Sequence, residues 1–179
     1  MSKTDIRICG MGGQGVIMTG LVLGKAVSIF EDRFATMIQS FGPEARGSTC
    51  SSQVILSDER IGYAYIKKSD VFLAFNQASY DKYIHELKDG GLLIYESELT
   101  VPDDRLPQNA KSFGIPATRL TLEKIGKLIV FNMVMVGFLS ANTDSVNMES
   151  VKKAIEDSVP EGTEDLNLKA FELGYSYKE

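Results

Sequence analysis

The chain has few of the residues that build metal centres and disulfide frameworks. Its 179 residues include two cysteines, Cys9 and Cys50, one histidine, His85, and no tryptophan. The cysteines lack the C-x-x-C spacing of metal sites, and two thiols with one imidazole are too few for a zinc or iron–sulfur centre. We therefore expect no metal in this chain, no disulfide framework, and the reduced thiols of a cytoplasmic protein.

An excess of positive charge and a long apolar run are also missing. Lys and Arg number 19 against 24 Asp and Glu, and the net charge of -5 gives no general reason to expect nucleic-acid binding. The longest apolar run, residues 128–139, contains Asn132 and is too short to span a bilayer. No apolar signal region precedes the first expected strand. These absences predict a soluble cytoplasmic protein that binds neither nucleic acid nor membrane.

The rest of the composition is that of an ordinary globular protein. Hydrophobic residues make up 44% of the chain and charged residues 24%. We expect one domain over residues 1–179, long enough to bury a sizeable core. The sequence pattern predicts an α/β class: a Rossmann-like opening unit, a mixed, partly antiparallel sheet flanked by helices, and a helical C-terminal third.

Hydrophobic periodicity and turn residues give the expected elements. Strands are expected near residues 6–9, 34–39, 49–56, 61–63, 71–75, 92–95 and 110–113. Helices are expected near residues 16–30, 77–87, 122–141, 148–158 and 163–173. Residues 57–60 predict the turn of an antiparallel hairpin. Asn76 is expected to cap the second helix, and the sequence Asp89-Gly90-Gly91 to end it.

The first distinctive motif is a glycine-rich turn between a strand and a helix. Gly10, Gly12 and Gly15 match G-x-G-x-x-G, Gly13 adds a fourth glycine, and Gln14 lies among them. Amides freed at the start of a helix, together with the helix dipole, favour a phosphate or carboxylate there. The motif indicates a nucleotide or phosphate site, and a purely structural strand-to-helix turn explains it equally well.

One observation argues against NAD. A dinucleotide fold places an acidic residue at the end of the second strand, where it binds the ribose. Here that strand ends at Gln39 and Ser40, whereas Glu31 and Asp32 precede it. A freestanding enzyme that binds NAD or FAD is therefore the alternative hypothesis and not the preferred one.

The second motif is the turn-rich segment 40–48, which carries Glu44 and Arg46. It follows the second strand, at the edge where open α/β sheets bind ligands. An arginine there can hold a carboxylate or phosphate with two parallel hydrogen bonds. A local ion pair, or contact of Arg46 with a neighbouring subunit, is an equally good reading.

No catalytic set stands out. His85 is expected to be a solvated helix residue, and we find no Ser-His-Asp arrangement and no paired catalytic carboxylates. Asn132, within an apolar helix, needs hydrogen-bond partners, so it is expected to tie that helix to a loop or to a partner chain. Gly20 and Gly24, four residues apart on one face of the first helix, permit close approach of a neighbouring backbone.

Taken together, the two motifs resemble the gamma subunit, or gamma domain, of the 2-oxoacid:ferredoxin oxidoreductases. The matching stretches are 10–16 and 39–47, with Ser57-Asp58, and with Asn132 followed by Gly137, further along the chain. Order and spacing cover essentially the whole chain. Ser48 departs from the pattern, because many relatives have a second glycine at that position.

The resemblance implies a subunit of an enzyme that decarboxylates a 2-oxoacid oxidatively with coenzyme A, giving an acyl-CoA and reduced ferredoxin. The version of the second motif is closest to the 2-oxoglutarate type, with pyruvate and branched-chain oxoacids as alternatives. Thiamine diphosphate, magnesium and iron–sulfur clusters are then expected in the alpha, beta and delta-type subunits, and none is held firmly by this chain. No catalytic residue is expected.

The resemblance also gives the expected ligand contacts. The residues expected to contact coenzyme A, or to support the thiamine subunit, are Gly10, Gly12, Gly13, Gln14, Gly15, Glu44, Arg46, Gly47 and Ser48. A non-catalytic assembly module, in which the glycine turn is only architecture, remains the other alternative.

Overall fold

The computed structural model describes residues 3–41 and 49–178. The strands are β1 (Lys3–Met11), β2 (Phe34–Phe41), β3 (Thr49–Ser57), β4 (Ser69–Ala74), β5 (Leu87–Glu96) and β6 (Lys111–Ile115). The helices are α1 (Val16–Phe30), α2 (Gln77–Tyr83), α3 (Ala117–Lys124), α4 (Phe131–Ala141), α5 (Met148–Glu156) and α6 (Glu164–Tyr175). Two short 3-10 helices, η1 (Ile84–Glu86) and η2 (Leu128–Val130), precede β5 and α4.

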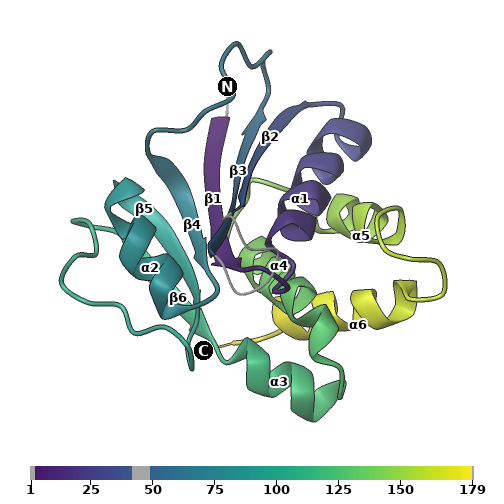
Figure 1. The fold of residues 1–179 in the computed structure, drawn as a ribbon. Helices are drawn as coiled ribbons and strands as arrows, with labels where there is room; N and C mark the ends of the chain where they lie inside the picture. The colour runs from purple at the N-terminus through teal and green to yellow at the C-terminus, as the bar shows by residue number, and fades with distance from the viewer. Residues whose placement is uncertain (1–2, 42–48, 179) are drawn as a thin grey trace.

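All six strands form one mixed sheet in the order β2-β3-β1-β4-β5-β6. β3 lies antiparallel between β2 and β1, and the pairs β1–β4, β4–β5 and β5–β6 are parallel. α1 leads from β1 toward one edge of the sheet, and α2 leads from β4 toward the other (Figure 1). The predicted α/β class with a mixed sheet is confirmed.

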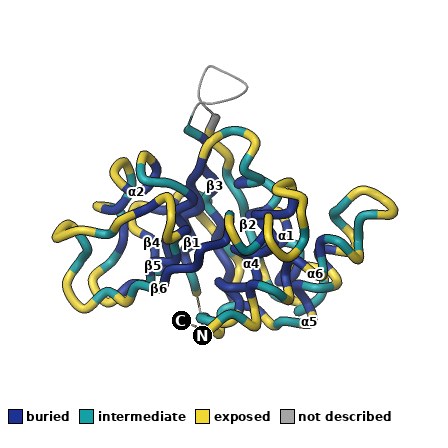
Figure 2. The backbone as a smooth tube through the Cα atoms, turned by 90° about the horizontal axis from the view of Figure 1, so that it is seen from below, coloured by how far each residue is buried: buried dark blue, intermediate teal, exposed yellow. Residues whose placement is uncertain are grey.

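Helices cover the two faces of the sheet unequally. α1, α4, α5 and α6 lie on one face and α2 on the other (Figure 1). Successive side chains of β1 point to opposite faces of the sheet. Ile6 and Ile8 belong to the larger hydrophobic cluster on one face, and Cys9 belongs with Tyr80 to the smaller cluster on the other. β1 and β4 are therefore buried at the centre of the molecule (Figure 2).

The helical C-terminal third is held together by close contact of α4 with α6. A Cβ atom on Gly137 would lie 2.0 Å from the carbonyl oxygen of Phe171, and one on Gly174 would lie 1.9 Å from that of Val134. Each helix therefore presents a glycine to the backbone of the other. This approach is open only to residues without a side chain, and it fixes α6 against the buried helix α4.

The predicted hairpin with a strand at 61–63 is wrong. β3 pairs with β1 on one side and with β2 on the other, so neither of its edges is left for residues 61–63. Those residues have no regular secondary structure. The segment is anchored instead by Ile66, which is buried and whose N–H donates to Oε1 of Gln53 at 2.9 Å.

Two helix predictions are also wrong. The helix after Asn76 ends at Tyr83, and Asp89, Gly90 and Gly91 belong to β5 instead of ending the helix. The expected helix 122–141 is interrupted between α3 and α4, where Gly126 has a φ of 78°. Leu128 and Ile129, the first residues of the longest apolar run, are 48% and 83% exposed because they lie in this interruption.

Candidate functional site

The glycine motif forms the predicted turn from β1 into α1. The N–H of Gln14 donates to the carbonyl oxygen of Met11 at 3.1 Å and closes the turn. Gly13 and Gly15 have φ values of 99° and 76°, which side chains rarely adopt. Gly10 ends the buried part of β1, and Gly12 lies in the turn. The structure therefore brings the five sequence-predicted residues 10 and 12–15 together.

The side chain of Gln14 fastens this turn to the neighbouring strand. Its Oε1 accepts from the backbone N–H of Met11 at 2.7 Å and from Nδ2 of Asn76 at 2.9 Å. Asn76 follows β4 and, as predicted, caps α2 by accepting from the N–H of Ser79 at 2.9 Å. Since α1 and α2 leave for opposite edges of the sheet, Gln14 spans the crevice where open α/β sheets bind ligands.

Asn132, on helix α4, supports the same turn through a hydrogen bond to Gly15. Its side chain is 4% exposed, and Nδ2 donates to the carbonyl oxygen of Gly15 at 3.5 Å. That oxygen also accepts from the N–H and the hydroxyl of Thr19. A Cβ atom on Gly15 would lie 2.5 Å from Cγ of Asn132, so the contact requires glycine. The prediction that Asn132 ties its helix to a loop is confirmed.

A cavity of about 280 Å³ opens beside the turn. It is lined by Gly13, Gly15, Met18, Ile129, Val130, Asn132, Met133, Val159, Pro160, Thr163, Leu166 and Asn167. Most of these side chains are apolar, and the polar ones belong to Asn132, Thr163 and Asn167. The first turn of α1 holds no acidic residue, and no side chain of the described residues caps its N-terminus. The cavity therefore lies beside a helix N-terminus, whose dipole favours negative charge.

The second predicted motif lies outside the described residues: Glu44, Arg46, Gly47 and Ser48 all fall within 42–48. The residues that flank this segment, Phe41 and Thr49, have defined positions in the sheet. Phe41 pairs with Cys50 at the end of β2, and Thr49 pairs with Met11 at the end of β1. Thr49, after the segment, therefore lies beside the start of the glycine turn, whereas Phe41, before it, lies one strand farther away.

The remaining titratable candidates lie away from this turn or are buried. His85 is exposed in η1, as expected of a solvated residue. Cys9 and Cys50 are free and buried, and burial raises the pKa of both thiols. Within residues 3–41 and 49–178, no group of three or more His, Cys, Asp or Glu can hold a metal ion. No helix in the same ranges is long and apolar enough to cross a membrane.

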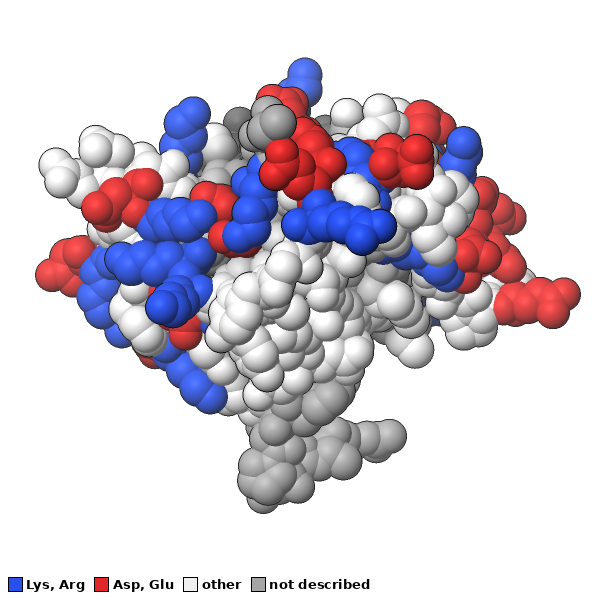
Figure 3. All heavy atoms as spheres, turned by 90° about the horizontal axis from the view of Figure 1, so that it is seen from above, with Lys and Arg blue, Asp and Glu red and all other residues white. Residues whose placement is uncertain are grey.

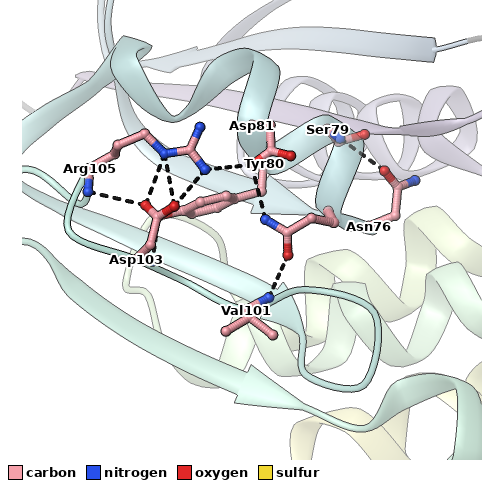
Figure 4. A network of polar contacts seen from close by, with 8 residues as sticks. Asn76, Ser79, Tyr80, Asp81, Val101, Asp103 and Arg105 are labelled. Atoms are coloured by element: carbon pink, nitrogen blue, oxygen red, sulfur yellow. Dashed lines mark hydrogen bonds and ion pairs between the residues drawn. The ribbon is translucent and has the colours of Figure 1, made fainter.

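The sequence reading missed an ion-pair network that fastens residues 97–110 to α2 (Figure 4). Arg105 binds Asp103 at 2.6 Å and Asp81 at 2.5 Å, and its guanidinium lies over the ring of Tyr80. The hydroxyl of Tyr80 donates to Asp103, and hydrogen bonds from Arg105 lower the pKa of that carboxyl to about 2. The sequence did not reveal this network, because nothing in its spacing indicates that Asp81 and Arg105 meet.

Glu96 is a second feature that the sequence did not reveal. It ends β5 with its side chain fully buried, and one carboxyl oxygen accepts from the N–H of Glu98 at 3.3 Å. The other oxygen has no hydrogen-bond partner among the described residues. Burial raises the pKa of this carboxyl. The group thus holds the start of the loop after β5 without reaching the cavity.

Figure 3 shows the charged side chains on one face of the molecule. Lys and Arg are most frequent on the left of that view, with acidic side chains among them, Asp and Glu predominate on the right, and an uncharged area lies at the lower centre. The basic side chains therefore do not form a continuous cover over this face.

The mixed α/β fold is shared with solved subunits of oxoacid oxidoreductases. A solved gamma subunit of a keto/oxoacid ferredoxin oxidoreductase from Geobacter sulfurreducens is 37% identical, with a TM-score of 0.83 and 96% of each chain covered. A 2-oxoglutarate:ferredoxin oxidoreductase chain from Magnetococcus marinus, bound to 2-oxoglutarate, coenzyme A and succinyl-CoA, has a TM-score of 0.82. Identity to it is 23%, and 99% of this chain matches 32% of that one, which shows the shared fold.

Sequence comparison gives the family. Residues 5–177 match the family model of the pyruvate ferredoxin/flavodoxin oxidoreductases. The 2-oxoglutarate synthase subunit KorC of Methanocaldococcus jannaschii is 42% identical over 174 residues, which cover 97% of this chain and 92% of that protein. The chain belongs to the pyruvate ferredoxin/flavodoxin oxidoreductase family.

Proposed function

We propose that this chain is the gamma subunit of a 2-oxoglutarate:ferredoxin oxidoreductase. The enzyme cleaves carbon dioxide from 2-oxoglutarate, joins the remaining acyl group to coenzyme A, and passes the released electrons to ferredoxin. The observation that carries the proposal is the glycine turn, braced by Gln14 and Asn132 beside a cavity, in a chain that belongs to this family. The identity of 42% to a 2-oxoglutarate synthase subunit supports the choice of substrate.

The redox and thiamine chemistry belongs to partner subunits in this proposal. The whole chain has two cysteines, whereas an iron–sulfur cluster is held by four thiolates. The described residues offer no acidic or histidine cluster for the magnesium of thiamine diphosphate. In this proposal these groups are therefore held by alpha, beta and delta-type subunits of a cytoplasmic complex.

Coenzyme A is the ligand that fits the turn best. Its pyrophosphate carries the negative charge that the uncapped start of α1 favours, and the space around Gly13 is open to it. The apolar cavity beside Gly15 and Asn132 suits part of the pantetheine arm. Glu44, Arg46, Gly47 and Ser48 join the proposed contacts on the strength of their motif, and Arg46 is the natural partner for a phosphate.

An assembly module without ligand contacts is the second candidate. The observation that favours it is the internal use of Gln14, whose side-chain oxygen is already occupied by Met11 and Asn76. In that case the turn only shapes the subunit for its partners. The two candidates differ in kinetics: ligand contacts change the KM for coenzyme A, whereas a pure assembly role changes only the yield of complex.

The test is reconstitution with the natural partners under anaerobic conditions. The complex that contains this chain is expected to reduce ferredoxin with 2-oxoglutarate and coenzyme A, and to be slower with pyruvate. Arg46→Ala is expected to weaken coenzyme A binding. Unchanged assembly, coenzyme A affinity and turnover in that variant would contradict the proposed placement. Binding of NAD by the isolated chain would instead support a freestanding dinucleotide enzyme.

A further inference from the structure

The two edge strands of the sheet are protected very differently. β6 has five residues, begins with Lys111 and is followed closely by Pro116. β2 has eight residues, Phe34–Phe41, with no charge and no proline among them. An edge strand presents unpaired N–H and C=O groups that bind other strands, and proteins usually block such edges with charges, prolines or short length. β2 lacks all three safeguards.

The edge at β2 continues into an apolar groove. A hollow of about 250 Å³ lies between α1 and β2. It is lined by Gly20, Leu21, Gly24, Lys25, Ser28, Ile29, Ala35, Thr36 and Met37. At its rim Leu21 is 43% exposed and Ile29 is 59% exposed, and on the other face of the strand Phe34 is 42% exposed. Exposed apolar side chains on both sides of an open strand are typical of an interface.

Gly24 supplies an independent observation. Glycine in a helix interior costs about 1 kcal/mol relative to alanine, so its presence needs a reason. Gly20 has one, because a Cβ atom there would lie 2.3 Å from Oγ of Ser52. At Gly24 the nearest atom is Cβ of Ala35 at 3.9 Å, an ordinary contact. No described residue of the chain requires glycine at position 24, and its effect is to leave the groove open.

We propose that a second copy of this chain occupies the groove, with the two β2 strands paired antiparallel across a two-fold axis. A strand is the partner that satisfies a row of unpaired backbone groups, and a two-fold contact places the same patch on both sides. Because β2 carries no charge, pairing it with itself opposes no like charges. The rim residues Leu21 and Ile29 of each copy then lie against the uncharged edge of the other.

This pairing goes beyond the proposed function. It involves the edge of the sheet at β2, whereas the proposed coenzyme A contacts include the turn after β1. Self-association can therefore be measured on the isolated full-length chain without coenzyme A or partner subunits.

Sedimentation equilibrium of the full-length chain is the test, with circular dichroism to confirm that each variant folds. Wild type is expected to form a dimer. Thr36→Lys, which puts a charge on the edge, is expected to raise the dimer dissociation constant by at least about tenfold, close to 1.4 kcal/mol. Ser112→Lys, the matched lysine on β6, is expected to leave it unchanged. A monomeric wild type, or equal effects of the two lysines, would overturn the proposal and leave the groove to a different subunit.

The variant Gly24→Ala distinguishes weaker dimerisation from a general loss of fold stability. At protein concentrations well below the dimer dissociation constant, the variant is expected to melt at a higher temperature than wild type, because alanine is the better helix former. It is also expected to raise the dimer dissociation constant, because the added methyl group enters the groove. A more stable chain with undiminished dimerisation would contradict the role proposed for Gly24.

Discussion

Oε1 of Gln14 accepts a hydrogen bond from Nδ2 of Asn76 at 2.9 Å, joining the turn after β1 to the turn after β4. The two strands are neighbours in the sheet, and their helices leave on opposite faces. In a dinucleotide-binding fold this crevice receives the cofactor. Here a side chain of the chain itself spans it, so the ligand site that we propose lies on the other side of the turn, at Gly13 and the cavity beside Asn132.

Replacing Gln14 tests how much this bridge stabilises the fold. Gln14→Ala removes the acceptor of two hydrogen bonds, from Met11 and from Asn76. Since each such bond contributes about 0.5–1.5 kcal/mol, the free energy of unfolding is expected to fall by about 1–3 kcal/mol in urea titrations. Gln108→Ala is the control, because that exposed side chain bonds to none of the described residues. Equal losses in both variants would show that the bridge contributes nothing.

The contact of Gly137 with α6 predicts a larger effect. Gly137→Ala places a methyl group where the carbonyl oxygen of Phe171 lies 2.0 Å away, so α4 and α6 must separate. We expect a loss of about 2 kcal/mol or more in the free energy of unfolding, despite the better helix propensity of alanine. Gly24→Ala serves as the comparison, because its methyl group meets no such obstacle. A stabilising effect at Gly137 would mean that the helices do not pack as described.

Acid is expected to release the loop after β5 from α2. Hydrogen bonds from Arg105 hold the pKa of Asp103 at about 2, below the ordinary value of about 3.9. A lowered folded-state pKa means that the contribution to stability is present above the ordinary pKa and is lost as pH falls toward the folded-state value. The N–H of Arg105 donates to Asp103, so its hydrogen-exchange protection is expected to fall between about pH 4 and about pH 2.

Two variants check the origin of that acid transition. Arg105→Gln is expected to raise the pKa of Asp103 toward its ordinary value, so that the loss of protection begins at a higher pH than in wild type. Arg119→Gln removes a different exposed ion pair, with Glu98, and is expected to leave the transition in place. Protection that stays constant down to the folded-state pKa would refute the ion-pair explanation.

The buried carboxyl of Glu96 is expected to affect stability with the opposite pH dependence to that of Asp103. Burial raises the folded-state pKa, so the folded chain holds this proton more tightly than the unfolded chain does. Stability is therefore full below the ordinary glutamate pKa of about 4.3 and falls as pH rises through the folded-state pKa. Glu96→Gln is expected to match wild type in acid and to be more stable at neutral pH. The exposed Glu161→Gln is the control, and a destabilised Glu96→Gln at neutral pH would show that the ionised carboxylate is required.

Local chemistry made the glycine turn and its supports predictable. A cap such as Asn76 needs only a polar side chain before a helix, and a buried amide such as Asn132 needs a partner, so both roles follow from the sequence. Strand partners depend on residues far apart, and the insertion of β3 between β1 and β2 was therefore missed. The helix break at Gly126 was missed because the surrounding residues continue the helical pattern.

The cavity was not predictable either, because its walls come from segments that are far apart in the sequence. Its walls come from the turn after β1, from η2 and α4, and from residues 159–167, which meet only through the packing of α4 and α6. Exposed Leu128 and Ile129 had the composition of core residues, and only the position of η2 puts them outside. The sequence therefore predicted the turn of the candidate site, and the fold supplied the cavity beside it.

The central claim is that the outer side of the glycine turn binds coenzyme A, and steady-state kinetics of the reconstituted complex test it most directly. Gly13→Ala strains a φ of 99° and puts a methyl group into the open space beside the turn. Gly90→Ala is the matched control, with a φ of 70° and equally open space in β5. We predict that Gly13→Ala raises the KM for coenzyme A by about tenfold, a loss close to 1.4 kcal/mol, with the KM for 2-oxoglutarate unchanged. Gly90→Ala is expected to change neither KM. An unchanged KM for coenzyme A in a fully assembled Gly13→Ala complex would contradict the claim.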